Sequence, residues 1–189
     1  MIKILSDDFD KYVKEMIEPD TPVNDKNNEI AEGNGEYLGN NFNTFPEEFQ
    51  NKILVFLDRK ILEFTPANNN DENGSMQELA NMMSNYEAFA GAFGFSIGNN
   101  FENLTEILQD RIFGLVENNS EYPDSNFARY LGFNFGQRLD KIPEKLQDKI
   151  LKHKAEDFFD GFEEGWQEAF DRFPVQTQNK ISQFRNHLK

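Results

Sequence analysis

The sequence predicts an all-α fold, a short α-solenoid of four antiparallel helical-hairpin repeats with an N-terminal capping helix. Three observations predict it. A nine-residue string recurs four times along the 189 residues, apolar residues upstream of each copy recur at spacings of four, and glycines recur at fixed places in that upstream pattern. Such internal recurrence is typical of repeat proteins, in which each repeat covers the apolar face of its neighbour.

The first expected element is a helix over residues 6–17. Ser6 is a suitable N-cap, and Phe9, Val13 and Ile17 share one face of the helix. We therefore expect a capping helix at the start of the array, followed by a loop.

The recurring string predicts the second helix of each hairpin, which we call helix B. Each copy has an apolar residue, Pro or Thr, and then Gln, Asn or Asp, Lys or Arg, and Ile. Proline is favoured in the first helical turn, and acidic residues near it oppose the positive end of the helix dipole. The copies are Phe45–Ile53, Leu104–Ile112, Ile142–Ile150 and Phe173–Ile181.

The upstream pattern predicts the first helix of each hairpin, helix A. Its apolar stripe has a spacing of four, which places these side chains on one face of a helix. The four stripes are Ile30, Asn34, Leu38 and Phe42; Phe89, Phe93, Ile97 and Phe101; Phe127, Leu131, Phe135 and Leu139; and Phe158, Phe162, Trp166 and Phe170. A linker of two or three residues suits a tight αα-hairpin.

Paired glycines occupy the same two places in the first three A helices. A glycine inside a helix costs about 1 kcal/mol relative to alanine, so six of them require a compensating gain. We expect this glycine face to receive the next repeat closely. The fourth repeat has Glu163 and Gln167 at these places, which predicts a polar terminal repeat. The pairs are Gly35 and Gly39, Gly94 and Gly98, and Gly132 and Gly136.

We expect these elements to form a single repeat domain. The uneven spacing of the copies leaves room for a polar loop, and residues 76–84 are expected to add helix before the second helix A. The predicted segments are 1–28 (cap and loop), 29–64 (repeat 1), 65–75 (polar loop), 76–118 (repeat 2), 119–153 (repeat 3) and 154–189 (repeat 4 and C-terminal cap).

The charge of the chain limits its partners. Its 34 acidic and 19 basic side chains give a formal net charge of −15, which disfavours nucleic acid and suits a basic protein partner. There is no cysteine and no apolar run long enough to span a membrane, and the first residues contain no apolar leader. We expect a soluble, cytoplasmic protein with no membrane or nucleic-acid contact.

Two polar columns of helix B are the candidate partner-contact residues. They are Gln50, Gln109, Gln147 and Gln178 in one column, and Lys52, Arg111, Lys149 and Lys180 in the other. The glutamines form either a ladder of amides that binds a peptide backbone or a set of bonds to the loop of each hairpin. The cations form either a solvated face paired with acidic neighbours or an anion-contacting ridge.

The unit from Phe127 to Ile150 resembles the tandem helical repeats of microbial proteins, and in outline it is similar to HEAT-like and tetratricopeptide-like solenoids. This resemblance covers about residues 29–187 and implies architecture, not activity. The tetratricopeptide pattern itself is not met, because the period is unsteady and its Trp and Tyr positions are absent. Residues 45–54 also resemble the start of an F-box, which would imply a ubiquitin-ligase adaptor. A similar string recurs at residues 142–151, whereas an F-box normally occurs once per chain.

Other residue patterns are weak candidates for chemistry. The string from Asn69 to Gly74 resembles a calcium loop, but Asn69 and Ala80 stand where an EF-hand has acidic ligands, so we interpret it as a hydrophilic turn. His153 and His187 are too few and too isolated for a metal site or triad. The carboxylates Asp157, Asp160, Glu163 and Glu164 could do acid–base work, but a solvent-exposed face accounts for them.

The sequence therefore predicts a non-enzymatic scaffold or adaptor without a cofactor, whose repeats offer an extended surface to a protein partner. The alternative is a structural subunit of a homo-oligomer or a larger assembly. The oligomeric state is left open by the sequence.

Overall fold

The computed structural model describes residues 25–58, 72–118, 126–153 and 155–187. These residues form eight α-helices and no strand, which confirms the all-α fold class. The capping helix expected over residues 6–17 lies outside the described residues, as does most of the polar loop.

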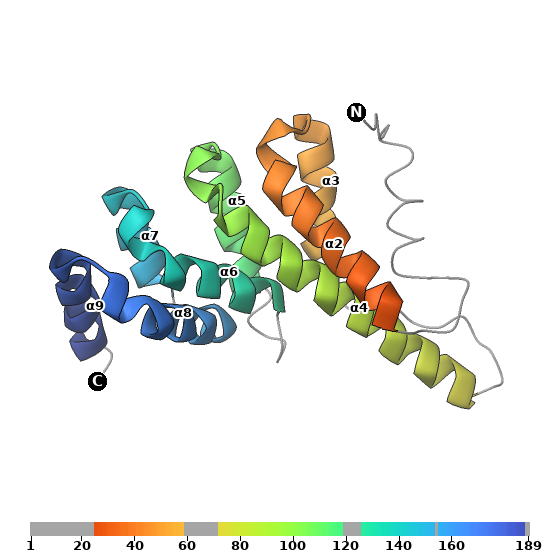
Figure 1. Ribbon diagram of the computed structural model, residues 1–189. Coiled ribbons are helices and arrows are strands. Elements are labelled where there is room, and N and C mark those ends of the chain that lie inside the picture. Colours follow the sequence, from red (N-terminus) through yellow and green to blue (C-terminus); the bar gives the residue numbers. More distant parts are fainter. Residues whose placement is uncertain (1–24, 59–71, 119–125, 154, 188–189) are drawn as a thin grey trace.

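The helices follow one another as four hairpins along an elongated array, from α2 and α3 at one end to α9 at the other (Figure 1). A short 3₁₀ turn joins the two helices of each hairpin. The pairs are α2 (Asp25–Asn41) with α3 (Glu47–Asp58), α4 (Glu72–Gly98) with α5 (Glu106–Asn118), α6 (Asn126–Gln137) with α7 (Glu144–Lys152), and α8 (Glu156–Ala169) with α9 (Val175–His187). The turns are Phe42–Thr44, Phe101–Asn103, Leu139–Lys141 and Phe170–Arg172. This arrangement is compatible with a helical-repeat fold.

The hairpins stack so that their helices form two layers. In the A layer, α2 packs on α4, α4 on α6, and α6 on α8. Helices α3, α5, α7 and α9 form the B layer, in which α3 and α5 are in contact. Stacking of like helices is what allows a repeat to cover its neighbour's apolar face.

The core lies between the layers and consists of the predicted stripes. Every apolar stripe residue of α4 and α6 and their turns is buried. The prediction that Ile30 belongs to the buried stripe of the first hairpin is wrong, because Ile30 is 51% exposed. Ala31, one position along the helix, is buried instead, together with Leu38 and Phe42. Near the start of α2 the buried face is therefore formed by Ala31 and Gly35 and not by Ile30 and Asn34.

Helix α4 is longer than the sequence indicates. It is continuous from Glu72 to Gly98, so the helix expected over residues 76–84 joins the second helix A without a break. Residues 72–75 are helical where a loop was expected. Asn73 and Gly74 therefore lie in the first turn of α4 and not in a calcium loop or hydrophilic turn. An acidic residue such as Glu72 is favoured at this end of a helix by its dipole.

The glycine face receives the next repeat, as predicted. A Cβ atom added to Gly132 would lie under 3.0 Å from the backbone oxygen of Phe158, and one added to Gly94 would meet that of Phe127. In the fourth hairpin the close approach is made from the opposite side, because Gly161 and Gly165 of α8 face the backbone of α6. Glycine thus brings the backbones of adjacent A helices into contact.

Candidate functional site

Each glutamine of the predicted ladder bonds to the turn of its own hairpin. The Nε2 group donates to the first carbonyl of the 3₁₀ turn, at 2.8 Å for Gln50 to Phe42 and 2.9 Å for Gln178 to Phe170. Gln109 and Gln147 do the same and, like Gln178, also donate to the carbonyl that precedes the Pro or Thr. The first carbonyl of each turn also accepts the backbone N–H of the residue that closes the turn, so the glutamine adds a second bond there and holds helix B against the turn.

Three of the four cations of the second column connect consecutive hairpins. Arg111 bonds to Asn51 of the preceding helix B, Lys149 pairs with Asp110, and Lys180 pairs with Asp148 at 2.6 Å. The partner is always the residue before the cation in the preceding copy of the string. We call these three pairs the B ladder. The two ion pairs contribute little to stability, since ion pairs at the surface are screened and entropically costly.

The electrostatics of the B layer follow from these pairs. The Lys180 ammonium lowers the pKa of the Asp148 carboxyl by hydrogen bonding. Lys145 pairs with Glu106 at 2.9 Å, and that hydrogen bond raises the pKa of Lys145. Both shifts favour the charged forms of Asp148 and Lys145.

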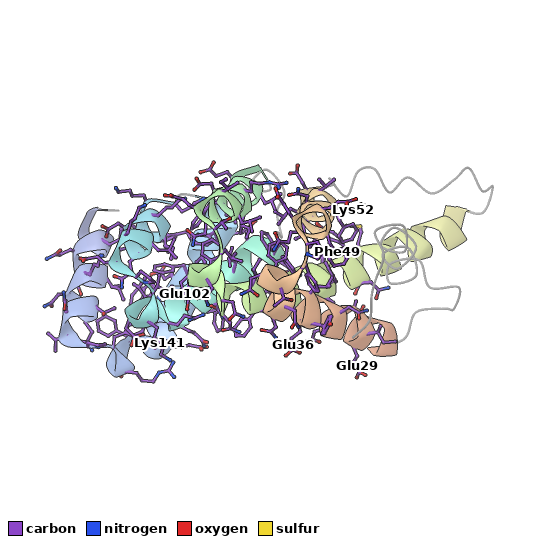
Figure 2. All side chains as sticks on the ribbon, turned by 90° about the horizontal axis from the view of Figure 1, so that it is seen from above. Glu29, Glu36, Phe49, Lys52, Glu102 and Lys141 are labelled. Carbon is purple, nitrogen blue, oxygen red and sulfur yellow. The ribbon has the colours of Figure 1, made fainter. Side chains whose placement is uncertain are left out.

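A polar groove of about 380 Å³ lies at the turns of the second, third and fourth hairpins, and we call it the basic groove. Its lining comes from three successive repeats and exists only when they stack. Lys141 lies along the same edge of the array as Glu36, whereas Lys52 on α3 lies along the opposite edge (Figure 2). The lining residues are Phe95, Asn99, Asn134, Gln137, Arg138, Lys141 and Arg172.

Arg138 is the anchored cation of the basic groove. Its guanidinium donates to the carbonyl oxygen of Gly98, the last residue of α4, at 2.7 Å and to the Glu102 carboxylate at 2.9 Å. The Arg138 and Glu102 side chains are only 16% and 24% exposed. A cation at a helix C-terminus is favoured by the dipole, and this contact fixes the third hairpin against the second.

Lys141 and Arg172 are open cations. Each is exposed and ends the 3₁₀ turn of its hairpin, so the two occupy the same place in consecutive repeats. Neither side chain forms an ion pair or a hydrogen bond with a described residue. Most other described cations are paired, as Arg129 is with Glu164. The basic groove therefore has two positive charges that form no ion pair with a carboxylate of the described residues.

Amide side chains form the remaining polar wall. Asn134 is 2% exposed and donates from Nδ2 to Asn99 Oδ1 at 2.9 Å. Its own Oδ1 faces Gly98, with no hydrogen-bond donor among the described residues. Gln137 donates to Glu168 at 2.9 Å. Beside these amides, the Phe95 ring packs against Phe133 and supplies an apolar patch.

The sequence predictions missed this groove, although a signal for it exists. The third residue of the turn is Thr44, Asn103, Lys141 and Arg172 in the four hairpins. This position becomes basic only in the last two repeats. The predicted contact residues, in contrast, are those whose residue type recurs in all four repeats, namely the glutamines and the cations of helix B. A column that changes along an array of like repeats is where a repeat protein distinguishes one end from the other.

The other chemical candidates remain dispersed. The carboxylates Asp160 and Glu164 are exposed on α8, and the latter pairs with Arg129. No cluster of three metal-ligating side chains occurs in the ranges that the structure describes. His153 is buried and stacks on Phe113 with ring centroids 5.1 Å apart. Burial lowers the pKa of His153, and the charge of Glu117 opposes that shift only in part.

Comparison with protein-family models, curated proteins and solved structures finds no match to this chain. Within the described residues, no helix is long and apolar enough to cross a membrane. The geometry of the stack is therefore the basis for a functional proposal.

Proposed function

We propose that this protein is a non-enzymatic scaffold or adaptor that binds a protein partner through its stacked repeats. One observation carries the proposal: the basic groove is assembled from three consecutive hairpins and provides unpaired charge, amides and an aromatic ring. A site of this kind depends on repeat stacking, which is how solenoids build extended binding surfaces.

A peptide-binding ladder requires side chains with free hydrogen-bonding groups, whereas most polar side chains in the two columns of helix B bond to the protein itself. Each glutamine Nε2 is committed to its own turn, and three of the cations are committed to the preceding repeat. The glutamines Gln50, Gln109, Gln147 and Gln178 thus close their own hairpins, and Arg111, Lys149 and Lys180 connect consecutive hairpins, whereas Lys52 belongs to the first repeat. A contact of these residues with a partner stays a prediction, as does a basic partner for the acidic surface as a whole.

The proposal is tested by affinity capture with the full chain, followed by reconstitution from purified components. We expect a captured protein to bind with defined stoichiometry by isothermal titration calorimetry, and to crosslink to residues of the second, third or fourth hairpin. A chain that binds no purified candidate and forms a discrete homo-oligomer by light scattering would contradict the adaptor function.

A second candidate function is a structural subunit, and the first hairpin favours it. Ile30 and Tyr37 of α2 are each 51% exposed, and Tyr37 stands at the helix position where Ser96 and Asn134 of later repeats face the preceding one. Exposed apolar side chains at such a position suit contact with another subunit. The Tyr37→Glu variant would dissociate such an oligomer, which light scattering would measure against the parent chain.

A further inference from the structure

We infer that the basic groove recognises an acidic peptide segment of the partner, with its carboxylates at the edge formed by Lys141 and Arg172. This inference deepens the proposed function and rests on it. The chain has a net charge of −15, yet the groove contains two cations that form no ion pair with a carboxylate of the described residues. Charge complementarity therefore identifies the chemistry of the missing partner.

The pairing elsewhere in the molecule strengthens this argument. Arg129, Arg138 and Lys180 each have a carboxylate within 3.0 Å, so the fold usually neutralises its cations. Lys141 and Arg172 end the 3₁₀ turns of consecutive repeats and line the same groove. An arginine fork beside a lysine binds carboxylates through short, charge-assisted hydrogen bonds.

The remaining lining suits a peptide. Asn99 and Gln137 line the groove, and the Asn99 Nδ2 donor and the Gln137 Oε1 acceptor form no hydrogen bond with a described residue. Such a donor and acceptor suit a peptide backbone. The Phe95 and Phe133 rings, with centroids 6.3 Å apart, provide an apolar surface for a neighbouring side chain. A volume of about 380 Å³ accommodates a short segment and not a folded element.

The charge balance favours a peptide carboxylate over a polyphosphate chain. The Glu102 carboxylate already compensates Arg138, which leaves the groove two uncompensated charges at its edge. A short acidic segment interacts with these cations within the screening length of about 8 Å at physiological salt. A nucleic acid extends beyond the groove and is repelled by the acidic surface around it.

The test is an NMR titration of the isotope-labelled full chain with a seven-residue capped peptide that has a central Phe and two acidic residues on each side. Its amide counterpart, with every acid replaced by Asn or Gln, is the control peptide. We expect shift changes confined to residues 95–103, 134–141 and 170–172, a dissociation constant of roughly 1 mM or tighter, and weaker binding as salt increases. Equal binding of the two peptides, or changes centred on the B layer, would overturn the inference.

Matched variants locate the binding energy. The double variant Lys141→Gln and Arg172→Gln should weaken peptide binding about tenfold or more, since it removes both open cations. Lys152→Gln is the control, because Lys152 is also exposed and forms no ion pair with a described residue, but does not line the groove. Undiminished binding by the double variant, with circular dichroism unchanged, would contradict the assignment.

Two further titrations separate the ligand chemistry. Inorganic phosphate and a single-stranded RNA oligomer, at matched ionic strength, should bind more weakly than the acidic peptide; tighter binding of either would overturn the carboxylate assignment. The inference and the adaptor function can fail separately. A reconstituted partner that crosslinks elsewhere and binds the double variant equally well would support the adaptor function and contradict the acidic-peptide site. Peptide binding at the groove of a chain that binds no protein partner would support the acidic-peptide site and contradict the adaptor function.

Discussion

The A and B layers of this protein join the same hairpins by different physical means. In the A layer, glycines bring neighbouring backbones into contact, so the spacing between repeats is set by atoms that cannot move aside. In the B layer, the consecutive helices are connected through side-chain pairs on the surface, such as Lys180 with Asp148. The close-packed layer therefore determines the geometry of the stack, and the B ladder adjusts register at little energetic cost.

The largest expected effect comes from filling the glycine contact. Gly132→Ala places a methyl group against the backbone of Phe158, which cannot yield without separating α6 from α8. We expect a loss of about 3 kcal/mol in the free energy of unfolding, measured by urea denaturation. Gly98→Leu is also expected to destabilise markedly, although the atom nearest to its Cβ would be the side-chain Oδ1 of Asn134 at 2.6 Å.

Gly114→Ala is the matched control for these substitutions. Gly114 lies inside α5 in the B layer, and a Cβ atom there would meet nothing within 4 Å. Alanine is favoured over glycine within a helix, so this variant should be stabilised by up to about 1 kcal/mol. An equal loss of stability at Gly114 and Gly132 would contradict the distinction between the layers.

The next effect comes from the glutamine that closes each hairpin. Gln178→Ala removes the donor to the carbonyls of Phe170 and Phe173 and should lower the free energy of unfolding by about 1–2 kcal/mol. Gln176→Ala, two residues earlier at an exposed position of the same helix, should change it by less than about 0.5 kcal/mol. Urea denaturation of both variants compares them directly, and similar losses would show that the bond contributes nothing.

His153 adds a pH-dependent term where the two layers meet. Its side chain is 5% exposed and packs against Phe113 and Phe158, and burial lowers its pKa below the ordinary 6.5. The unfolded chain thus binds this proton more readily, so stability is full above about pH 6.5 and falls as the pH drops through the folded-state pKa. His153→Phe should flatten this part of the stability profile, measured as melting temperature between pH 7.5 and 5. An unaltered slope in the variant would exclude His153 as its cause.

The smallest effect is expected for the B ladder. A double-mutant cycle with Asp110→Asn and Lys149→Met should give a coupling energy below about 1 kcal/mol, because the two side chains are 60% and 39% exposed. The coupling should decrease further in 1 M salt, where charges are screened over about 3 Å. A coupling energy as large as the loss of stability in Gly132→Ala would contradict the ranking of the two layers.

Much of the fold was predictable because its causes are local or recur along the chain. The apolar stripes of α4 and α6 and the paired glycines follow from helical periodicity and repetition, and their burial and contacts agree with the prediction. Ile30 was assigned wrongly to the core because a single weak stripe does not distinguish two adjacent faces of α2. The first residues of α4 were expected to be loop because their composition is polar, whereas the long helix continues through them.

The basic groove could not be predicted in the same way. Lys141 and Arg172 are 31 residues apart in the sequence, and only stacking of the third hairpin on the fourth places both in the lining of one groove. Similarly, the sequence left two interpretations of Gln147, and the 2.9 Å bond to Leu139 shows which backbone its amide reaches.

By itself, the sequence determined the all-α class, the four hairpins and the glycine face, because each depends on spacing along a helix and on repetition between copies. Only the tertiary structure decided which charges are neutralised and which stay open. Arg138 reaches the end of α4 and the Glu102 carboxylate, and Lys141 and Arg172 reach no carboxylate of the described protein. Ion pairing depends on distances of a few ångströms between side chains of different repeats, and the packing of the A helices sets those distances.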